Sequence, residues 1–231
     1  MEFHGINKTT LLDFPKHIAC TVFTGRCNLR CPFCHNGDLV LQPDSQPFIT
    51  EEKILSFLER RKDTLEGICI TGGEPTLQKD LLPFLRKCKD LGYLTKLDTN
   101  GTRPDVIQAA LEANLLDYIT MDIKNSPARY AETCGLSNVR FSDFETSVEL
   151  IKKSGIPYEF RTTVVKEFHT KEDFIAIGEW LKGSSLYALQ AFKDSGNLIQ
   201  PGLSGYTKDE LTAFCELLSP YFDEVLLRGV D

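Results

Sequence analysis

The segment "IACTVFTGRCNLRCPFCHNGD", residues 18–38, joins a short apolar run to a loop that holds three cysteines. The run at 18–24 is rich in β-branched and aromatic residues, which predicts a strand that ends near Thr24. Cys27, Cys31 and Cys34 follow with the spacing C-x3-C-x2-C, and no further cysteine occurs in the next thirty positions. We therefore expect the three thiols at the carboxyl end of a strand, the edge where β/α folds carry their chemistry.

Apolar runs of the same kind recur along the chain and alternate with amphipathic stretches. Further strands are predicted at 67–71, 93–99, 118–123, 158–165, 186–192 and 224–229, and helices at 50–63, 79–92, 103–116, 143–155, 170–183 and 207–219. Thr170 and Thr207 each precede an acid by three residues, which predicts capping boxes. This alternation predicts parallel β/α units.

Two architectures fit parallel units of this number, an open doubly wound sheet and a barrel. A complete eight-stranded barrel usually needs about 250 residues, whereas this chain offers six strands with crossover helices and a terminal strand. The favoured fold class is α/β, a partial (β/α)6 TIM-type barrel. We expect one domain over 1–231, with a core at about 16–200, a short N-terminal lead-in and a C-terminal helix–strand extension.

Composition limits the setting in which the chain works. Its formal net charge of −7 argues against a general polyanion binder, so no nucleic-acid partner is expected. Apolar runs are all far shorter than the roughly 18 residues of a membrane span, and the N-terminus lacks the layout of a signal peptide. We expect a cytoplasmic protein whose thiols stay reduced, so its eight cysteines indicate metal ligation or packing rather than disulfides.

Three clustered thiolates without a fourth have a specific use in iron chemistry. They can hold three irons of a cubane [4Fe–4S] cluster, which leaves the fourth iron open to a substrate or cofactor. A zinc site completed by His35 or a distant cysteine is one alternative, and three unrelated buried thiols are another. Packing is the favoured interpretation of the remaining cysteines: Cys20, Cys69, Cys88, Cys134 and Cys215.

The stretch "CNLRCPFC" resembles the C-x3-C-x-aromatic-C motif of the radical S-adenosylmethionine superfamily, with Phe33 at the aromatic position. The resemblance implies that Cys27, Cys31 and Cys34 ligate a [4Fe–4S] cluster. It also implies that the fourth iron binds the amino and carboxylate groups of S-adenosyl-L-methionine. The partial-barrel fold is the one this superfamily leads us to expect.

Polar groups follow each of the next predicted strands. "TGGEP" at 71–75 offers glycines that permit close backbone approach and positive φ, and Glu74 can accept hydrogen bonds from an ammonium group. Such stretches can also be plain turns, solvated charges or internal salt bridges. Their convergence at successive strand ends nevertheless suits one zwitterionic, nucleoside-bearing ligand. The expected cofactor-binding residues are Phe33, Cys34, His35, Asn36, Gly72, Gly73, Glu74, Pro75, Asp98, Thr99, Asn100, Asp122, Lys124, Arg161, Gln190, Phe192 and Lys193.

The flanks of these motifs narrow the resemblance. "CHN" at 34–36, "LDTNG" at 97–101 and "MDIK" at 121–124 are similar to the activating enzymes of glycyl radical proteins. "LLDFP" at 11–15 and "EFRTTVV" at 159–165 look most like the activating proteins of anaerobic ribonucleoside-triphosphate reductase. Activators of pyruvate formate-lyase are close neighbours, but they carry a histidine near the place of Lys193.

This resemblance implies a reaction and its partners. The reduced cluster cleaves S-adenosylmethionine, and the resulting 5′-deoxyadenosyl radical takes hydrogen from a glycine of a partner enzyme. The expected partners are a glycyl radical enzyme, foremost anaerobic ribonucleotide reductase, and a low-potential electron donor such as flavodoxin or ferredoxin. Radical chemistry on a small molecule is an alternative within enzymes, and a zinc-binding adaptor is the alternative without catalysis.

Overall fold

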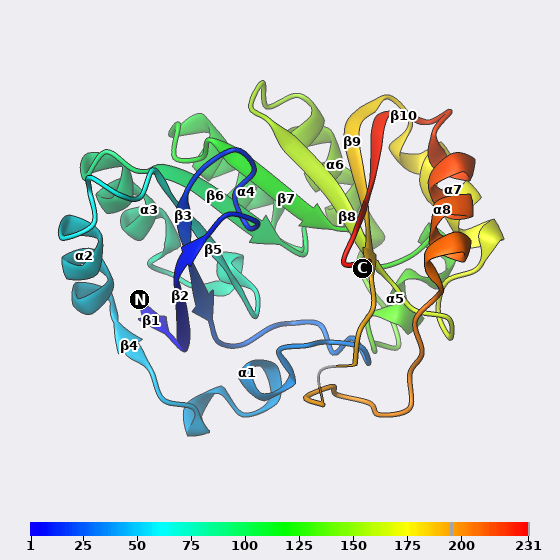
Figure 1. Ribbon diagram of the computed structural model, residues 1–231, viewed down its shortest axis with the longest axis horizontal. Coiled ribbons are helices and arrows are strands. Elements are labelled where there is room, and N and C mark those ends of the chain that lie inside the picture. The colour runs from blue at the N-terminus through cyan, green and yellow to red at the C-terminus, as the bar shows by residue number, and fades with distance from the viewer. Residues whose placement is uncertain (195, 231) are drawn as a thin grey trace.

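The computed structural model describes residues 1–194 and 196–230, and in these ranges eight strands form one sheet (Figure 1). Seven of them run parallel, and β2 pairs antiparallel with β3. The strands are β2 (Gly5–Thr10), β3 (Ala19–Thr24), β5 (Gly67–Gly72), β6 (Leu94–Thr99), β7 (Tyr118–Asp122), β8 (Tyr158–Val164), β9 (Ser184–Ala191) and β10 (Phe222–Arg228).

The order of the strands distinguishes between the two architectures left open above. From one edge to the other it is β2-β3-β5-β6-β7-β8-β9-β10, so each parallel strand lies beside the strand that precedes it in the chain. In a doubly wound sheet the order of the strands reverses at a switch point, whereas in a barrel neighbouring strands follow one another along the chain. The predicted partial barrel is confirmed, with β2 and β10 as its two edges (Figure 1).

Six helices connect consecutive parallel strands and cover the outer face of the sheet (Figure 1). Both predicted capping boxes form, Thr170 with Asp173 and Thr207 with Glu210. Across the described residues, every helix is too short or too polar to cross a membrane. The crossover helices are α2 (Glu51–Glu59), α3 (Leu81–Asp90), α4 (Pro104–Glu112), α6 (Phe141–Lys152), α7 (Lys171–Leu181) and α8 (Lys208–Leu218).

The apolar pattern misses several short elements. In β2 three of the six residues, Asn7, Lys8 and Thr9, are exposed, so no apolar run marks this strand, and it is held by pairing with β3. The other elements have two to five residues, too few to show a period. They are β1 (Glu2–Phe3), β4 (Ile49–Thr50), α1 (Gly37–Leu41), α5 (Tyr130–Thr133) and the 3-10 turns η1 (Pro43–Ser45), η2 (Pro75–Leu77) and η3 (Pro127–Arg129).

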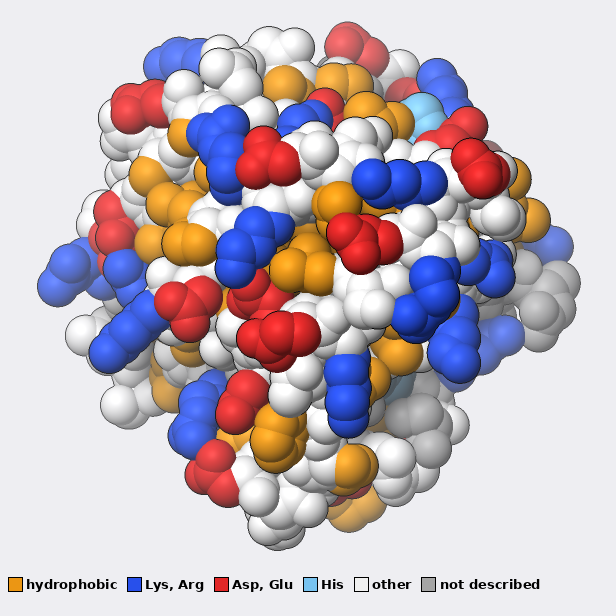
Figure 2. Space-filling view, turned by 90° about the vertical axis from the view of Figure 1, so that its left-hand side faces the viewer, with side chains coloured by type: hydrophobic (Ala, Val, Ile, Leu, Met, Phe, Trp, Pro, Cys, Tyr) orange, Lys and Arg blue, Asp and Glu red, His pale blue; other side chains and the backbone are white. Residues whose placement is uncertain are grey.

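The two faces of the sheet bury different kinds of side chain. Toward the helices lies an apolar core in which Cys20 and Cys88 are fully buried, consistent with the packing role expected of them. The interior of the barrel is polar instead and encloses paired charges, among them Lys96 and Glu159. The outer surface over α2 carries basic and acidic side chains interspersed with apolar ones (Figure 2).

Inside the barrel, Glu159 on β8 is 1% exposed and is held by Arg228 on β10. The two guanidinium nitrogens donate to its two oxygens at 2.8 and 2.7 Å. We expect Arg228→Met to lower the free energy of unfolding by about 2 kcal/mol, because it leaves a buried carboxylate without its cation. The effect stays below that of a fully buried pair since the Arg228 side chain is 29% exposed. Urea unfolding measures it.

A surface ion pair provides the matched control for this change. Lys153 and Glu149 lie one helical turn apart at 2.9 Å, with side chains 76% and 55% exposed. Lys153→Met should change stability by less than about 0.5 kcal/mol because exposed pairs are weak. Equal effects of Arg228→Met and Lys153→Met would contradict a structural role for the pair between β8 and β10.

Candidate functional site

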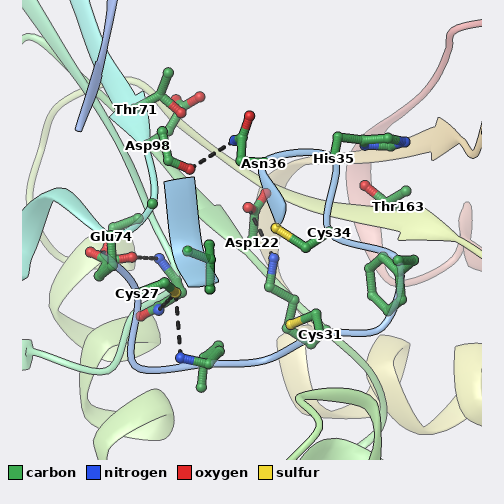
Figure 3. A pocket seen from close by; sticks show the side chains of 18 of the residues that line it. Cys27, Cys31, Cys34, His35, Asn36, Thr71, Glu74, Asp98, Asp122 and Thr163 are labelled. Carbon is green, nitrogen blue, oxygen red and sulfur yellow. Dashed lines mark hydrogen bonds and ion pairs between the residues drawn. The ribbon is translucent and has the colours of Figure 1, made fainter. Parts of the chain in front are cut away.

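A cavity of about 260 Å³ lies where the parallel strands end (Figure 3). Side chains from the loop after β3 and from the ends of β5, β6, β7, β8 and β9 line it. The structure thus brings groups that are up to 163 positions apart in the chain, from Cys27 to Gln190, to one site. The lining includes, of the residues singled out in the sequence, Cys27, Cys31, Phe33, Cys34, His35, Asn36, Gly72, Gly73, Glu74, Asp98, Thr99, Asn100, Asp122, Lys124, Arg161 and Gln190.

Three residues expected at the cofactor, Pro75, Phe192 and Lys193, are not among the residues that line the cavity. Pro75 begins the turn η2. Phe192 stacks on the His35 ring at a centroid distance of 5.6 Å, and the Lys193 carbonyl oxygen lies 2.8 Å from His35 Nε2. His35, which lines the cavity, is therefore in contact with the segment after β9 through its ring face and its Nε2.

The cysteines occupy two sides of the cavity. Cys27 lies beside Glu74, and Cys31 and Cys34 lie opposite (Figure 3). The Leu29 amide and the Asn100 side-chain amide donate to Cys27 Sγ, at 3.4 and 3.6 Å. Burial raises the pKa of Cys27 to about 12, so this free thiol is protonated at neutral pH and a metal must displace its proton. Burial also raises the pKa of Cys34.

Cys134, which was assigned to packing, lies next to the cysteine loop. Its carbonyl oxygen accepts a hydrogen bond from the Arg30 amide at 2.8 Å, and its side chain is fully buried. The Cys134 thiol lowers the pKa of Cys31, which favours the thiolate form of that side chain. The sequence carries no signal for this contact, because α5 brings Cys134 to the loop from about a hundred residues away.

Backbone hydrogen bonds join the cysteine loop to the Gly-Gly-Glu-Pro turn. The Gly73 and Glu74 amides donate to the carbonyl oxygens of Thr24 and Arg26, both at 2.7 Å. Of the two glycines only Gly72 has a positive φ, +113°. Gly73 is required by space, since a Cβ there would lie 1.9 Å from the Arg26 carbonyl oxygen. The expectation of positive φ thus applies to Gly72, and that of close approach to Gly73.

Glu74 is a buried carboxylate, 1% exposed, without a protein cation. Its Oε1 accepts from both Thr76 donors and from Thr99 Oγ1, and its Oε2 accepts from the Asn100 amide at 2.6 Å. Burial raises the pKa of Glu74, and none of the lysines and arginines in the described ranges forms an ion pair with it. Its second oxygen therefore retains capacity for a cationic donor in the cavity.

Opposite charges alternate along the cavity wall. Arg161 lies 2.9 Å from Asp122 Oδ1 and 3.5 Å from Asp98 Oδ2, and Lys124 lies 3.1 Å from Asp122 Oδ2. Burial opposes ionisation of Asp122, but Arg161 and Lys124 outweigh it and lower its pKa to about 2. Asp122 also raises the pKa of Lys124. The wall thus stays charged at neutral pH and can receive a carboxylate.

Sequence reasoning assigned no role to four residues of the lining: Leu29, Val40, Thr71 and Thr163. Thr163 was detectable, because it follows Arg161 by two positions and so shares its face of β8. Val40 was not, since its place depends on the short helix α1. Thr71 ends β5, where the strand-end rule also applies.

The donor set of this cavity fits an iron–sulfur cluster and a zwitterionic cofactor. Three thiols line it, N–H donors already approach Cys27 Sγ, and Glu74 lacks a cation. Hydrogen bonds to sulfur are a usual feature of iron–sulfur ligation. Among the described residues no three His, Cys, Asp or Glu side chains are gathered closely enough to hold a single metal ion.

Comparison with known proteins finds relatives of this chain in sequence and in fold. A protein of Methanocaldococcus jannaschii, provisionally named a glycyl-radical enzyme activating enzyme, is 32% identical over 98% of this chain and 95% of its own length. A pyruvate formate-lyase-activating enzyme of Clostridium pasteurianum is 32% identical over 65% of this chain and 64% of its own. The Streptococcus suis protein SuiB has a similar fold, with a TM-score of 0.71 at 16% identity over 90% of this chain. The match spans about half of SuiB (48%).

A partial barrel with three cysteines on its first strand-end loop is the arrangement that the sequence motif led us to expect. The chain belongs to the radical SAM superfamily, whose family model matches residues 21–181. Membership implies a [4Fe–4S] cluster and S-adenosylmethionine as cofactors.

Proposed function

We propose that this radical SAM enzyme is an activase, which generates a glycyl radical on a partner enzyme. The observation that carries the proposal is similarity along 98% of the chain to a protein with that provisional name. The chain has 231 residues, and its described part is taken up by the barrel, its crossover helices and short connections. The cavity at the strand ends would hold the cofactor. A loop of the partner enzyme would enter at its open side.

The cluster would be held by Cys27, Cys31 and Cys34, one thiolate for each of three irons. The fourth iron would be left for the cofactor, which explains why the motif has three cysteines. When bound, the reduced cluster and S-adenosylmethionine together supply a 5′-deoxyadenosyl radical. The amide donors on Cys27 Sγ and the Cys134 thiol would stabilise charge on the ligating sulfurs.

The remaining lining residues would bind and orient S-adenosylmethionine. Glu74 would accept from its ammonium group, because its Oε2 retains capacity and its burial disfavours an unpaired charge. Lys124 and Arg161 would face its carboxylate. Gln190 and Thr163, at the ends of β9 and β8, would lie toward the nucleoside. The enclosing loops would keep water from the radical. In cofactor enzymes the protein binds, orients and shields, while the cofactor carries out the reaction.

The partner we infer is an anaerobic ribonucleotide reductase. The "LLDFP" stretch at 11–15 and the "EFRTTVV" stretch at 159–165 support it. "LLDFP" lies before β3, at the end of the barrel opposite the cavity, with Leu11 and Leu12 exposed and Phe14 buried. Pyruvate formate-lyase is the second candidate, favoured by the 32% identity to an activating enzyme of that protein. Flavodoxin or ferredoxin would supply the electron.

Electron paramagnetic resonance tests this function. The reduced, cluster-loaded protein is mixed anaerobically with S-adenosylmethionine and an anaerobic ribonucleotide reductase of the source organism. We expect a glycyl doublet on the reductase, which disappears when its radical-site glycine is changed to alanine. Pyruvate formate-lyase is the parallel sample. 5′-Deoxyadenosine formation without a radical on any glycyl radical enzyme of that organism would contradict the proposal and favour a small-molecule substrate.

A further inference from the structure

Lys96 on β6 is a buried lysine outside the lining of the cavity, with 2% of its surface exposed. It precedes Asp98 by two positions, so both side chains point into the barrel from one face of the strand. Its Nζ forms an ion pair with Asp98 Oδ1. The same nitrogen lies 3.7 Å from Cys69 Sγ on β5 and 5.8 Å from the centroid of the Tyr118 ring on β7.

Lys96 is one end of a chain of five alternating charges. Each charge pairs with the next in the order Lys96, Asp98, Arg161, Asp122 and Lys124. Three cations face two carboxylates, so the chain carries one excess positive charge. Four of its members line the cavity and Lys96 does not, and the one carboxylate that pairs with Lys96 among the described residues is Asp98.

A lysine in this position needs an explanation, because burial of an ammonium group is costly unless it is paired. Burial by itself would lower the pKa of Lys96, but the charge of Asp98 outweighs it and the pKa is raised. Lys96 therefore stays protonated. An apolar side chain would fill the space beside Tyr118 without this cost, which indicates that the charge has a use.

We propose that Lys96 is a positioning residue for the cofactor site. By pairing with Oδ1 of Asp98, it leaves Arg161 and Lys124 oriented toward the carboxylate of S-adenosylmethionine. The inference rests on the proposed function. It explains the buried lysine by the excess positive charge that Lys96 gives to the five-membered chain.

The spacing within the chain shows what the loss of Lys96 would do. Arg161 now lies closer to Asp122, at 2.9 Å, than to Asp98, at 3.5 Å. Without Lys96, Asp98 would have Arg161 as its nearest cation. It would draw the Arg161 guanidinium away from Asp122 and toward the place that Lys96 now occupies. Asp122 would then hold Lys124 more tightly. The five-membered chain would become two cations paired with two carboxylates, with no excess positive charge left for a carboxylate ligand.

Equilibrium binding of S-adenosylmethionine to the cluster-loaded, unreduced protein tests the proposal without turnover. We expect Lys96→Met to raise the dissociation constant roughly 10-fold. The same change is made in an Asp98→Asn background. If Lys96 acts through Asp98, its replacement there should alter the dissociation constant by less than about 2-fold, because the carboxylate it orients is gone.

Arg228→Met is the matched control. It also removes the cation that pairs with a buried carboxylate inside the barrel, but neither Arg228 nor Glu159 lines the cavity. Its affinity for S-adenosylmethionine should equal that of the unaltered protein. Should Lys96→Met fail to fold, Lys96→Gln replaces it in the cycle, since glutamine keeps an N–H donor for Asp98 while it removes the charge.

The outcomes separate this inference from the function on which it rests. An equal loss of affinity in both backgrounds would show that Lys96 acts only by packing and would overturn the proposal. If Lys96→Met leaves the affinity unchanged in the protein that keeps Asp98, the proposal is overturned as well. If the unaltered protein binds no S-adenosylmethionine, the proposed function fails and the inference fails with it. If Lys96→Met loses affinity in the protein that keeps Asp98 but not in the Asp98→Asn background, the result supports both the inference and the proposed function.

Discussion

Replacement of Cys27, Cys31 or Cys34 by alanine is expected to abolish the cluster and all cleavage of S-adenosylmethionine. Each thiolate would be the protein's hold on one iron of the cubane, so no single loss can be compensated within the loop. Anaerobic reconstitution of the unaltered protein should give roughly four irons per chain. Each of the three variants should fall far below that content. Iron and sulfide analysis measures the cluster, and 5′-deoxyadenosine formation measures the cleavage.

Cys88→Ala is the matched control, because Cys88 is also a fully buried thiol but lies on α3 among apolar side chains. It should lose some stability from the cavity it creates, yet keep its iron and its activity. Uptake of one zinc per chain without iron would instead support the zinc-binding adaptor. Retention of four irons by any variant of the loop would show that the assigned ligand is wrong.

Gly73→Ala is expected to weaken binding of S-adenosylmethionine by roughly 100-fold, equivalent to about 3 kcal/mol. The new Cβ would lie 1.9 Å from the Arg26 carbonyl oxygen and 2.7 Å from its carbon. Both are backbone atoms of the loop that carries Cys27, so the loop or the turn must move. Either movement breaks the pairing of the Glu74 amide with Arg26 and displaces the Glu74 carboxylate. Isothermal titration under anaerobic conditions measures the affinity.

Gly5→Ala supplies the comparison for this substitution. Gly5 also lacks a positive φ, but a Cβ there would make ordinary contact, 3.4 Å from the Phe23 ring. Its affinity for S-adenosylmethionine should be unchanged. If Gly73→Ala binds the cofactor as tightly as Gly5→Ala does, the Gly-Gly-Glu-Pro turn is not part of the cofactor site.

The parallel strands could be predicted because each is a short apolar run bounded by polar turns. A buried strand needs such a run, so this information is local. The six crossover helices followed from amphipathic stretches between the runs, and their alternation with strands predicted the parallel sheet. Strand β2 was missed because its stability comes from pairing with β3, while three of its six residues are exposed.

The candidate site could be located for the same local reason. Parallel strands bring their carboxyl ends to one edge, so residues that follow different strands converge without knowledge of any contact. This rule placed Glu74, Asp122 and Arg161 at one cavity. After β9 it also singled out Phe192 and Lys193, which contact His35 and are not among the residues that line the cavity.

Contacts across the barrel were decided by tertiary structure alone. The alternation of a strand puts Lys96 and Asp98 on one face, but which face points inward depends on how β6 pairs with β5 and β7. In the same way, Cys134 reaches Cys31 only because the chain between β7 and α6 folds back over the cysteine loop. A motif holds residues a few positions apart and so is visible in the chain, whereas the energy of a buried charge depends on neighbours that only folding brings near.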